Sequence, residues 1–190
     1  MSLFSKLIFA FSISATAAMA APKDFAPIRE KLARHKVVEG KFKQVRTIKD
    51  MDLHLESEGT FRFEQPLNLN WVQSKPFDLK LTMSPDRIVQ KSFDGSEQVI
   101  TKEQQPSVFV FSASFLEVFS GNEESLKKNF TTEVTVQGDK WQISLVPRDE
   151  LLKKAIAAVE IRGAEFVSRV RVQEKNGNAT EIEFTGVKAK

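Results

Sequence analysis

Apolar and polar residues alternate with a period of two along most of the chain after residue 37. In residues 38–44, for example, Val38, Phe42 and Gln44 lie on one side of an extended chain and charged residues on the other. Alternation of this kind is typical of antiparallel β-strands that bury one face. Strands are predicted at residues 38–44, 53–55, 61–63, 67–71, 77–83, 134–136, 141–145, 159–161, 166–172 and 182–187.

Turn signals accompany these runs. Ser57-Glu58-Gly59 and Asp94-Gly95 predict turns, and Asn176-Gly177 is a strong hairpin signal. The strands therefore follow one another in simple succession along the chain, which predicts an antiparallel sheet.

Helical spacing replaces the alternation in four segments. The longest, residues 106–121, carries apolar side chains at helical spacing and has Gly121 as a stop signal. A short amphipathic helix is predicted at residues 25–35, before the first strand. Shorter helices are predicted at residues 122–128 and 149–156.

Together these elements predict a mainly β fold. We expect ten or eleven strands in an antiparallel sheet that curls into an unclosed barrel, with an N-terminal helix. The apolar helical segment in the middle of the chain is the predicted lid over the open side. A large curled sheet often encloses a ligand cavity rather than a solid core.

The first twenty residues have the features of a cleavable secretory signal peptide. Lys6 precedes the apolar run 7–13, and Ala18-Met19-Ala20 matches a small-x-small cleavage site. The apolar run is shorter than the roughly 20 residues that span a bilayer, which disfavours the alternative of a membrane anchor. We expect residues 1–20 to be removed and residues 21–190 to form one domain in the periplasm.

The composition narrows the classes of function. The chain has no cysteine, which excludes disulfides, thiolate metal sites and a cysteine nucleophile. Its 28 basic and 25 acidic side chains nearly balance and form no dense basic patch, which argues against a nucleic-acid partner. Sixteen Phe and no Tyr leave the chain with much apolar aromatic surface to bury.

The sequence contains no signature of an enzyme. The G-x-S-x-G motif and the glycine-rich phosphate loop are both absent. His54 and Glu56 share one face of a predicted strand, but two ligands are too few for a metal site. The other histidine, His35, ends the first predicted helix. We therefore expect no catalytic residue, no metal and no cofactor.

The apolar residues are more informative, and they allow two interpretations. Leu69, Trp71 and their neighbours on the next predicted strand would share one face of the sheet, opposite the phenylalanines of the predicted lid. A cavity lined in this way could hold an acyl chain, whose burial contributes about 0.8 kcal/mol per CH₂. In the alternative interpretation the same side chains pack on each other and leave no space.

Several segments resemble a known family. Residues 40–46 (GKFKQVR) resemble the early strand with an F-x-Q motif of the periplasmic lipoprotein carrier (LolA) family. Residues 59–76 (GTFRFEQPLNLNWVQSKP) are similar to that family's most recognisable stretch: a Gly-led strand, an aromatic residue, Arg-Pro, an apolar residue, Trp and a further Pro. Leu145–Pro147, the later Asn-Gly hairpin and residues 182–184 follow the same course. The resemblance covers nearly all of residues 21–190.

The resemblance implies an unclosed barrel with a helical lid over a hydrophobic cavity. Such proteins shield the acyl chains of lipoproteins between an inner-membrane donor and the outer membrane. The implied cavity residues are Phe42, Phe61, Phe63, Leu69, Trp71, Phe77, Leu79 and Leu81. The implied lid residues are Phe109, Phe111, Phe115, Leu116 and Phe119.

Two departures from the family pattern bear on the cargo. Gln65 stands before Pro66, where the family has an arginine that latches the lid. The chain also ends soon after Phe184, where typical carriers continue. Because a neutral amide makes weaker hydrogen bonds than a guanidinium, we expect a divergent member with a less firmly held lid.

The leading functional hypothesis is a monomeric periplasmic carrier of a lipidated cargo, which is a lipoprotein or another lipid. Its expected partners are the acyl chains of the cargo, an inner-membrane donor and an outer-membrane acceptor. The alternative hypothesis is an interaction protein of the cell envelope that binds another protein through the sheet and lid and holds no lipid.

Overall fold

The computed structural model describes residues 25–190, apart from the side chains of residues 107, 108, 110, 111, 114 and 125. The predicted signal peptide and the side chain of Phe111 lie outside the described residues. The helices are α1 (Ala26–Ala33), α2 (Pro106–Ser120), α3 (Glu123–Asn129) and α4 (Glu150–Ala155), with a 3₁₀ turn at Lys49–Met51. The strands are β1 (Val37–Ile48), β2 (Leu53–Glu64), β3 (Asn68–Lys75), β4 (Leu79–Met83), β5 (Arg87–Ser92), β6 (Glu97–Thr101), β7 (Phe130–Gln137), β8 (Lys140–Pro147), β9 (Ile156–Gly163), β10 (Val167–Glu174) and β11 (Ala179–Ala189).

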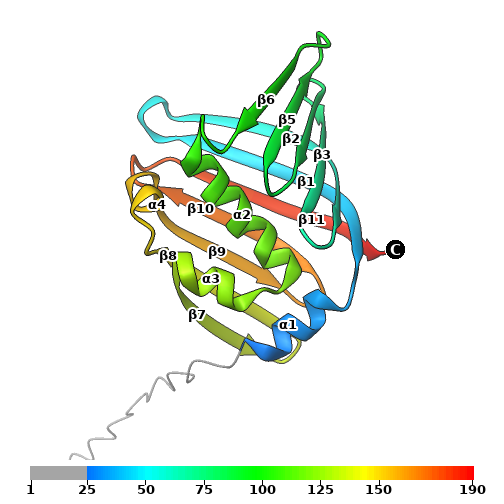
Figure 1. The fold of residues 1–190 in the computed structure, drawn as a ribbon, viewed down its shortest axis with the longest axis vertical. Coiled ribbons are helices and arrows are strands. Elements are labelled where there is room, and N and C mark those ends of the chain that lie inside the picture. The colour runs from blue at the N-terminus through cyan, green and yellow to red at the C-terminus, as the bar shows by residue number, and fades with distance from the viewer. Residues whose placement is uncertain (1–24) are drawn as a thin grey trace, which may run out of the picture.

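The eleven strands of residues 25–190 form one antiparallel sheet in the order β6-β5-β4-β3-β2-β1-β11-β10-β9-β8-β7. The first and last strands of the chain pair with each other at its centre. Strands β6 and β7 are its two edges and do not meet, so the sheet curls without closing (Figure 1). The prediction of a mainly β fold with an unclosed barrel and an N-terminal helix is confirmed.

Helix α2 runs across the hollow of the curled sheet, beside α1 and α3 (Figure 1). Pro106 occupies its first turn, where the missing N–H costs no hydrogen bond. Gly121 ends the helix with φ +71° and donates its N–H to the carbonyls of Glu117 and Val118. A Cβ at Gly121 would lie 3.1 Å from backbone atoms of Arg29, so the glycine also lets α1 approach closely.

Aromatic side chains form the part of the core where the central strands meet α2. Phe42 of β1 lies opposite Phe184 of β11 and stacks on Trp71, with ring centres 3.6 Å apart. Phe119 of α2 packs on Phe63 and on Phe184 at centre distances of 5.5 Å and 5.8 Å. These contacts anchor the C-terminal end of α2 to the sheet.

Two parts of the sheet differ from the predicted pattern. Residues 57–59 form no turn but lie within β2, a strand of 12 residues that joins the predicted strands 53–55 and 61–63. Gly59 serves a different purpose, because a Cβ there would lie 1.9 Å from the carbonyl oxygen of Val72, where the register of β2 and β3 shifts. Strands β5 and β6 show no clear alternation in sequence and form by pairing at the edge of the sheet.

Within residues 25–190, no helix has both the length and the apolar character needed to cross a bilayer. The same residues bring together no group of three or more His, Asp or Glu side chains that could hold a metal ion. His54 instead shares a hydrogen bond of 3.1 Å with Thr47 on the neighbouring strand.

Candidate functional site

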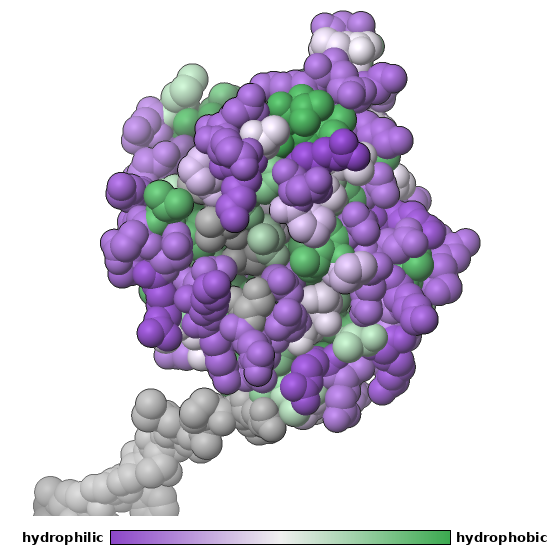
Figure 2. Space-filling model, viewed as in Figure 1, coloured by the Kyte–Doolittle hydropathy of each residue, from purple (hydrophilic) through white to green (hydrophobic). Residues whose placement is uncertain are grey.

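A largely apolar cavity of about 410 Å³ lies between the concave face of the sheet and α2, partly open to solvent. Its volume is within the range of roughly 300–1,000 Å³ that is typical of small-molecule sites. On this face of the molecule, hydrophobic surface emerges in patches between hydrophilic side chains (Figure 2). The lining residues are Gln44, Arg46, Leu69, Trp71, Leu81, Met83, Ser112, Phe115, Leu152, Ala155, Ile156, Val172, Glu174, Thr180 and Ile182.

Four parts of the fold supply these residues, one of them strand β1, which contributes Gln44 and Arg46. Strands β3 and β4 form one wall through two cross-strand pairs, Leu69–Met83 and Trp71–Leu81. Strands β10 and β11 and the junction of α4 with β9 form the opposite wall. The middle of α2 covers the space with Phe115, while the C-terminal end of the helix is held in the aromatic core.

What distinguishes this cavity is its apolar lining rather than its size, because two other hollows formed by described residues have similar volumes. Side chains that border an empty apolar space lose dispersion contacts, which lowers the stability of the fold. The lining can regain those contacts from an apolar ligand, so the space has the properties of a binding site.

One end of the cavity is polar. Arg46 of β1 lies opposite Thr180 of β11, and both are close to Glu174 at the end of β10. The Nη2 atom of Arg46 is 2.8 Å from Oε1 of Glu174. Its Nη1 atom donates to the hydroxyl of Thr180 at 3.5 Å. The lining of the cavity thus changes from hydrocarbon and indole side chains to the ion pair of Arg46 and Glu174 at one end.

The structure brings four of the predicted site residues to the cavity: Leu69, Trp71, Leu81 and Phe115. Leu79 is half-buried at the start of β4 and is not part of the lining. The other predicted cavity and lid residues with described side chains, Phe77 excepted, are buried in the protein interior: Phe42, Phe61, Phe63, Phe109, Leu116 and Phe119.

Phe77 does not face the cavity, which corrects the expectation from the alternation of residues 77–83. Strand β4 begins only at Leu79, after a turn in which Nε2 of Gln73 donates to the carbonyl of Phe77 at 3.0 Å. The Phe77 side chain is 52% exposed, and the centre of its ring lies 6.4 Å from the centre of the Phe93 ring. Strand β4 is therefore shorter than the alternating segment, residues 77–83, from which it was predicted.

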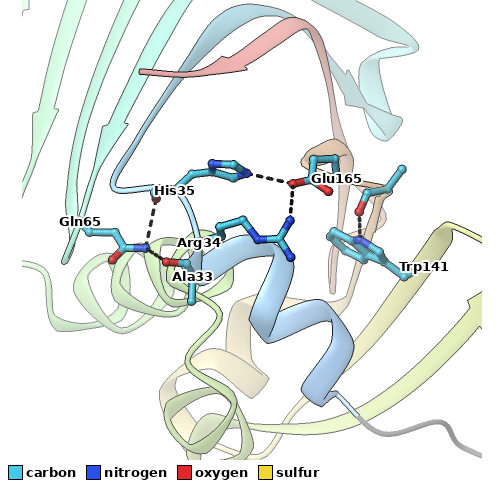
Figure 3. A network of polar contacts seen from close by, with 7 residues as sticks. Ala33, Arg34, His35, Gln65, Trp141 and Glu165 are labelled. Carbon is cyan, nitrogen blue, oxygen red and sulfur yellow. Dashed lines mark hydrogen bonds and ion pairs between the residues drawn. The ribbon is translucent and has the colours of Figure 1, made fainter.

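Gln65 binds the end of α1 rather than the predicted lid, which corrects the expected latch. Its Nε2 atom donates to the carbonyls of Ala33 and His35, each at 3.2 Å (Figure 3). Its backbone N–H donates to the carbonyl of Lys36 at 2.8 Å. Because the end of β2 pairs with the start of β1, Gln65 lies beside the segment that connects α1 to the sheet.

Glu165 holds the same end of α1 from the turn between β9 and β10. Its carboxylate accepts a hydrogen bond of 2.9 Å from Nε2 of His35 and lies 3.8 Å from Nη1 of Arg34 (Figure 3). In that turn, the indole N–H of Trp141 donates to the carbonyl of Ala164 at 2.7 Å. The hydrogen bond from His35 lowers the pKa of the Glu165 carboxyl below its usual 4.5; desolvation opposes this shift and Arg34 reinforces it.

The lowered pKa of Glu165 predicts a pH-dependent part of the stability. A carboxyl with a lowered pKa in the folded state stabilises the fold above its usual pKa and loses this contribution as the pH falls through the folded value. At about pH 7 we expect E165Q to unfold more easily than the unmodified protein, by less than about 1 kcal/mol because the Glu165 side chain is 45% exposed. Urea unfolding at about pH 7 and about pH 3 measures the difference, which should shrink at the lower pH. A difference that stays constant would contradict this role of Glu165.

The pattern of apolar positions does not predict the polar residues of the cavity, Arg46, Glu174 and Thr180. The sequence nevertheless contains a signal for the first of them. The alternation that turns Phe42 and Gln44 inward reaches Arg46 two residues later, because side chains of a strand repeat with a period of two. A charged residue on the inward face of a long strand is thus an indication of a polar end to the cavity.

The family model described as "Outer membrane lipoprotein carrier protein LolA" matches residues 33–190. The match extends from the end of α1 to the end of the chain and includes every residue of the cavity lining. A comparison with curated protein sequences found no match.

Two solved structures are similar to this chain over most of its length. A DUF1329 family protein from Desulfovibrio piger is 7% identical and gives a TM-score of 0.51, over 88% of this chain and 91% of that one. A LolA superfamily protein from Nitrosomonas europaea is 9% identical and gives a TM-score of 0.48, over 88% of this chain and 94% of that one. At 7% identity, the likeness to the Desulfovibrio piger protein concerns the fold alone.

Proposed function

Because the chain belongs to the family of outer membrane lipoprotein carrier proteins, LolA, we propose that it carries the acyl chains of a lipidated cargo through the periplasm. The observation that carries this proposal is the apolar cavity of about 410 Å³ under α2. The cargo is a lipoprotein or another lipid. The protein binds it, shields it from water and releases it, and no bond is made or broken.

The lining explains how one cavity serves such a cargo. Leu69, Trp71, Leu81 and Phe115 present hydrocarbon and aromatic surface, which attracts an acyl chain without directional contacts. Each buried CH₂ contributes about 0.8 kcal/mol. Affinity then depends mainly on the length of chain that is buried, and a family of related chains is accepted.

In this proposal α2 moves to let the cargo enter and leave. Its C-terminal end is fixed by Phe119, which packs on Phe63 and Phe184, so we assign the movement to the part of α2 that precedes Phe115. Segments that open in this way belong to the less stable part of a fold. In this proposal residues 1–20 direct export, residues 21–190 act as a monomeric domain, and an inner-membrane donor and an outer-membrane acceptor exchange the cargo with it.

A series of linear alcohols tests the proposal, because their head group is small and uncharged. We expect calorimetric affinity to rise about fourfold for each added methylene, which corresponds to about 0.8 kcal/mol, until the chain fills the cavity. Burial of the chain should also give a negative heat-capacity change. Affinity that does not depend on chain length would favour the alternative of an interaction protein that holds no lipid.

A further inference from the structure

The cavity offers a place for a head group as well as for a chain. We propose that Arg46 binds the anionic group, a carboxylate or a phosphate, of an amphiphile whose acyl chain occupies the apolar part of the cavity. This inference rests on the proposed function and deepens it, because it names the chemical class of the ligand.

The first support is the direction in which the cavity changes character. From Phe42 through Gln44 to Arg46, every second side chain of β1 lies on the concave face, and polarity increases along this row. Glu174 reaches the same end from β10. An amphiphile has the same order of parts, with hydrocarbon at one end and a charge at the other.

The second support is the bonding capacity that Arg46 retains. Its Nη2 atom is engaged with Glu174 at 2.8 Å, but its Nη1 atom is 3.5 Å from the hydroxyl of Thr180, at the limit of a hydrogen bond. A guanidinium has five N–H donors in a fork that fits two oxygens of a carboxylate or phosphate. The Arg46 side chain is 41% exposed, so a bound molecule can reach the remaining donors.

Glu174 sets the strength of this interaction. Its carboxylate, 21% exposed, neutralises Arg46 when no ligand is bound. A chain that fills the cavity displaces water and lowers the local dielectric, which strengthens the attraction between Arg46 and an anion. The ligand's anion and Glu174 then share one guanidinium, so the like charge of Glu174 weakens binding of the anion. A cationic head group could pair only with the carboxylate of Glu174, which is already paired with Arg46.

The test compares dodecanoate with dodecanol, two probes with the same chain length and different head groups. We expect the protein to bind dodecanoate at least about tenfold more tightly, the effect of one hydrogen bond to a charged group. In R46M the ratio of the two affinities should fall to one or below, because the remaining carboxylate of Glu174 repels the anion. In E174Q the ratio should rise severalfold, because Arg46 loses its internal counter-ion.

Two further variants control this comparison. R169M removes another arginine that pairs with a glutamate. Nη2 of Arg169 on β10 lies 2.6 Å from Oε1 of Glu181 on β11, on the face of these two strands opposite the cavity. This variant should leave both affinities unchanged. Because R46M leaves Glu174 without its partner, the double variant R46M/E174Q removes both charges and should give a ratio of about one. Circular dichroism and thermal unfolding establish that each variant is folded.

The outcomes separate the two proposals. Equal binding of both probes, or a preference for dodecanoate that persists in R46M and R46M/E174Q, would overturn the role of Arg46 and leave the carrier proposal standing. Binding of neither probe would overturn both. Dodecyl phosphate, as a third probe, shows which anion fits better, and an Arg46-dependent preference for either anion supports the inference.

Discussion

Replacing Ser112 with tryptophan is expected to weaken the binding of a long-chain alcohol by about a hundredfold. Ser112 lies on α2 and lines the cavity, so an indole at this position fills space that the ligand needs. If the indole excludes about four methylenes, the loss is about 3 kcal/mol, which is about a hundredfold in affinity. The fold should keep its stability, because the new side chain occupies an apolar space that is otherwise empty.

The matched control for S112W is K128W, which adds the same side chain at an exposed position of α3. Calorimetry with dodecanol should show unchanged affinity for K128W, and thermal unfolding should show that both variants are folded. Undiminished affinity in a folded S112W would place the binding site elsewhere on the molecule.

Replacing Phe63 with alanine is expected to lower the free energy of unfolding by about 3–5 kcal/mol. Phe63 is fully buried, and its ring lies 5.5 Å from that of Phe119, which anchors α2. The substitution therefore leaves a void under the C-terminal end of the helix. The substitution should increase the rate of amide exchange more in α2 than in β10, because α2 loses a contact and β10 does not.

F93A is the control for F63A, because Phe93 is 74% exposed and the same truncation removes little buried surface. We expect F93A to change the free energy of unfolding by no more than about 0.5 kcal/mol. Urea unfolding measures both variants. A loss below about 1 kcal/mol in F63A would mean that α2 is not anchored through this aromatic contact.

Much of the fold follows from the alternation of side chains. The inward positions of Phe42, Leu69, Trp71 and Leu81 can be read directly, because one buried face imposes a period of two on a strand. Strands β5 and β6, at and next to one edge of the sheet, show no such alternation, since little of either strand is buried. The turn predicted at Gly59 is wrong for another reason. A glycine that permits close approach of two backbones cannot be distinguished in the sequence from a glycine that permits a turn.

The cavity itself is harder to derive from sequence. A solid core and a lined cavity require the same apolar side chains at the same positions, and they differ only in the distance between the walls. Leu152 and Ala155 join the lining because α4 turns into β9 at that point, which no strand pattern indicates. The contact of Gln65 with α1 likewise depends on which strand ends meet, and this is known only once the sheet is assembled.

The most direct test of the carrier function is organic extraction of the protein from a periplasmic fraction, followed by mass spectrometry of the extract. The unmodified protein is predicted to release acylated molecules in amounts comparable with the protein, and S112W is predicted to release far less. If Arg46 selects the head group, these molecules carry a carboxylate or a phosphate. An extract of the unmodified protein that contains no more acylated material than that of S112W would contradict the claim that the cavity carries acyl chains.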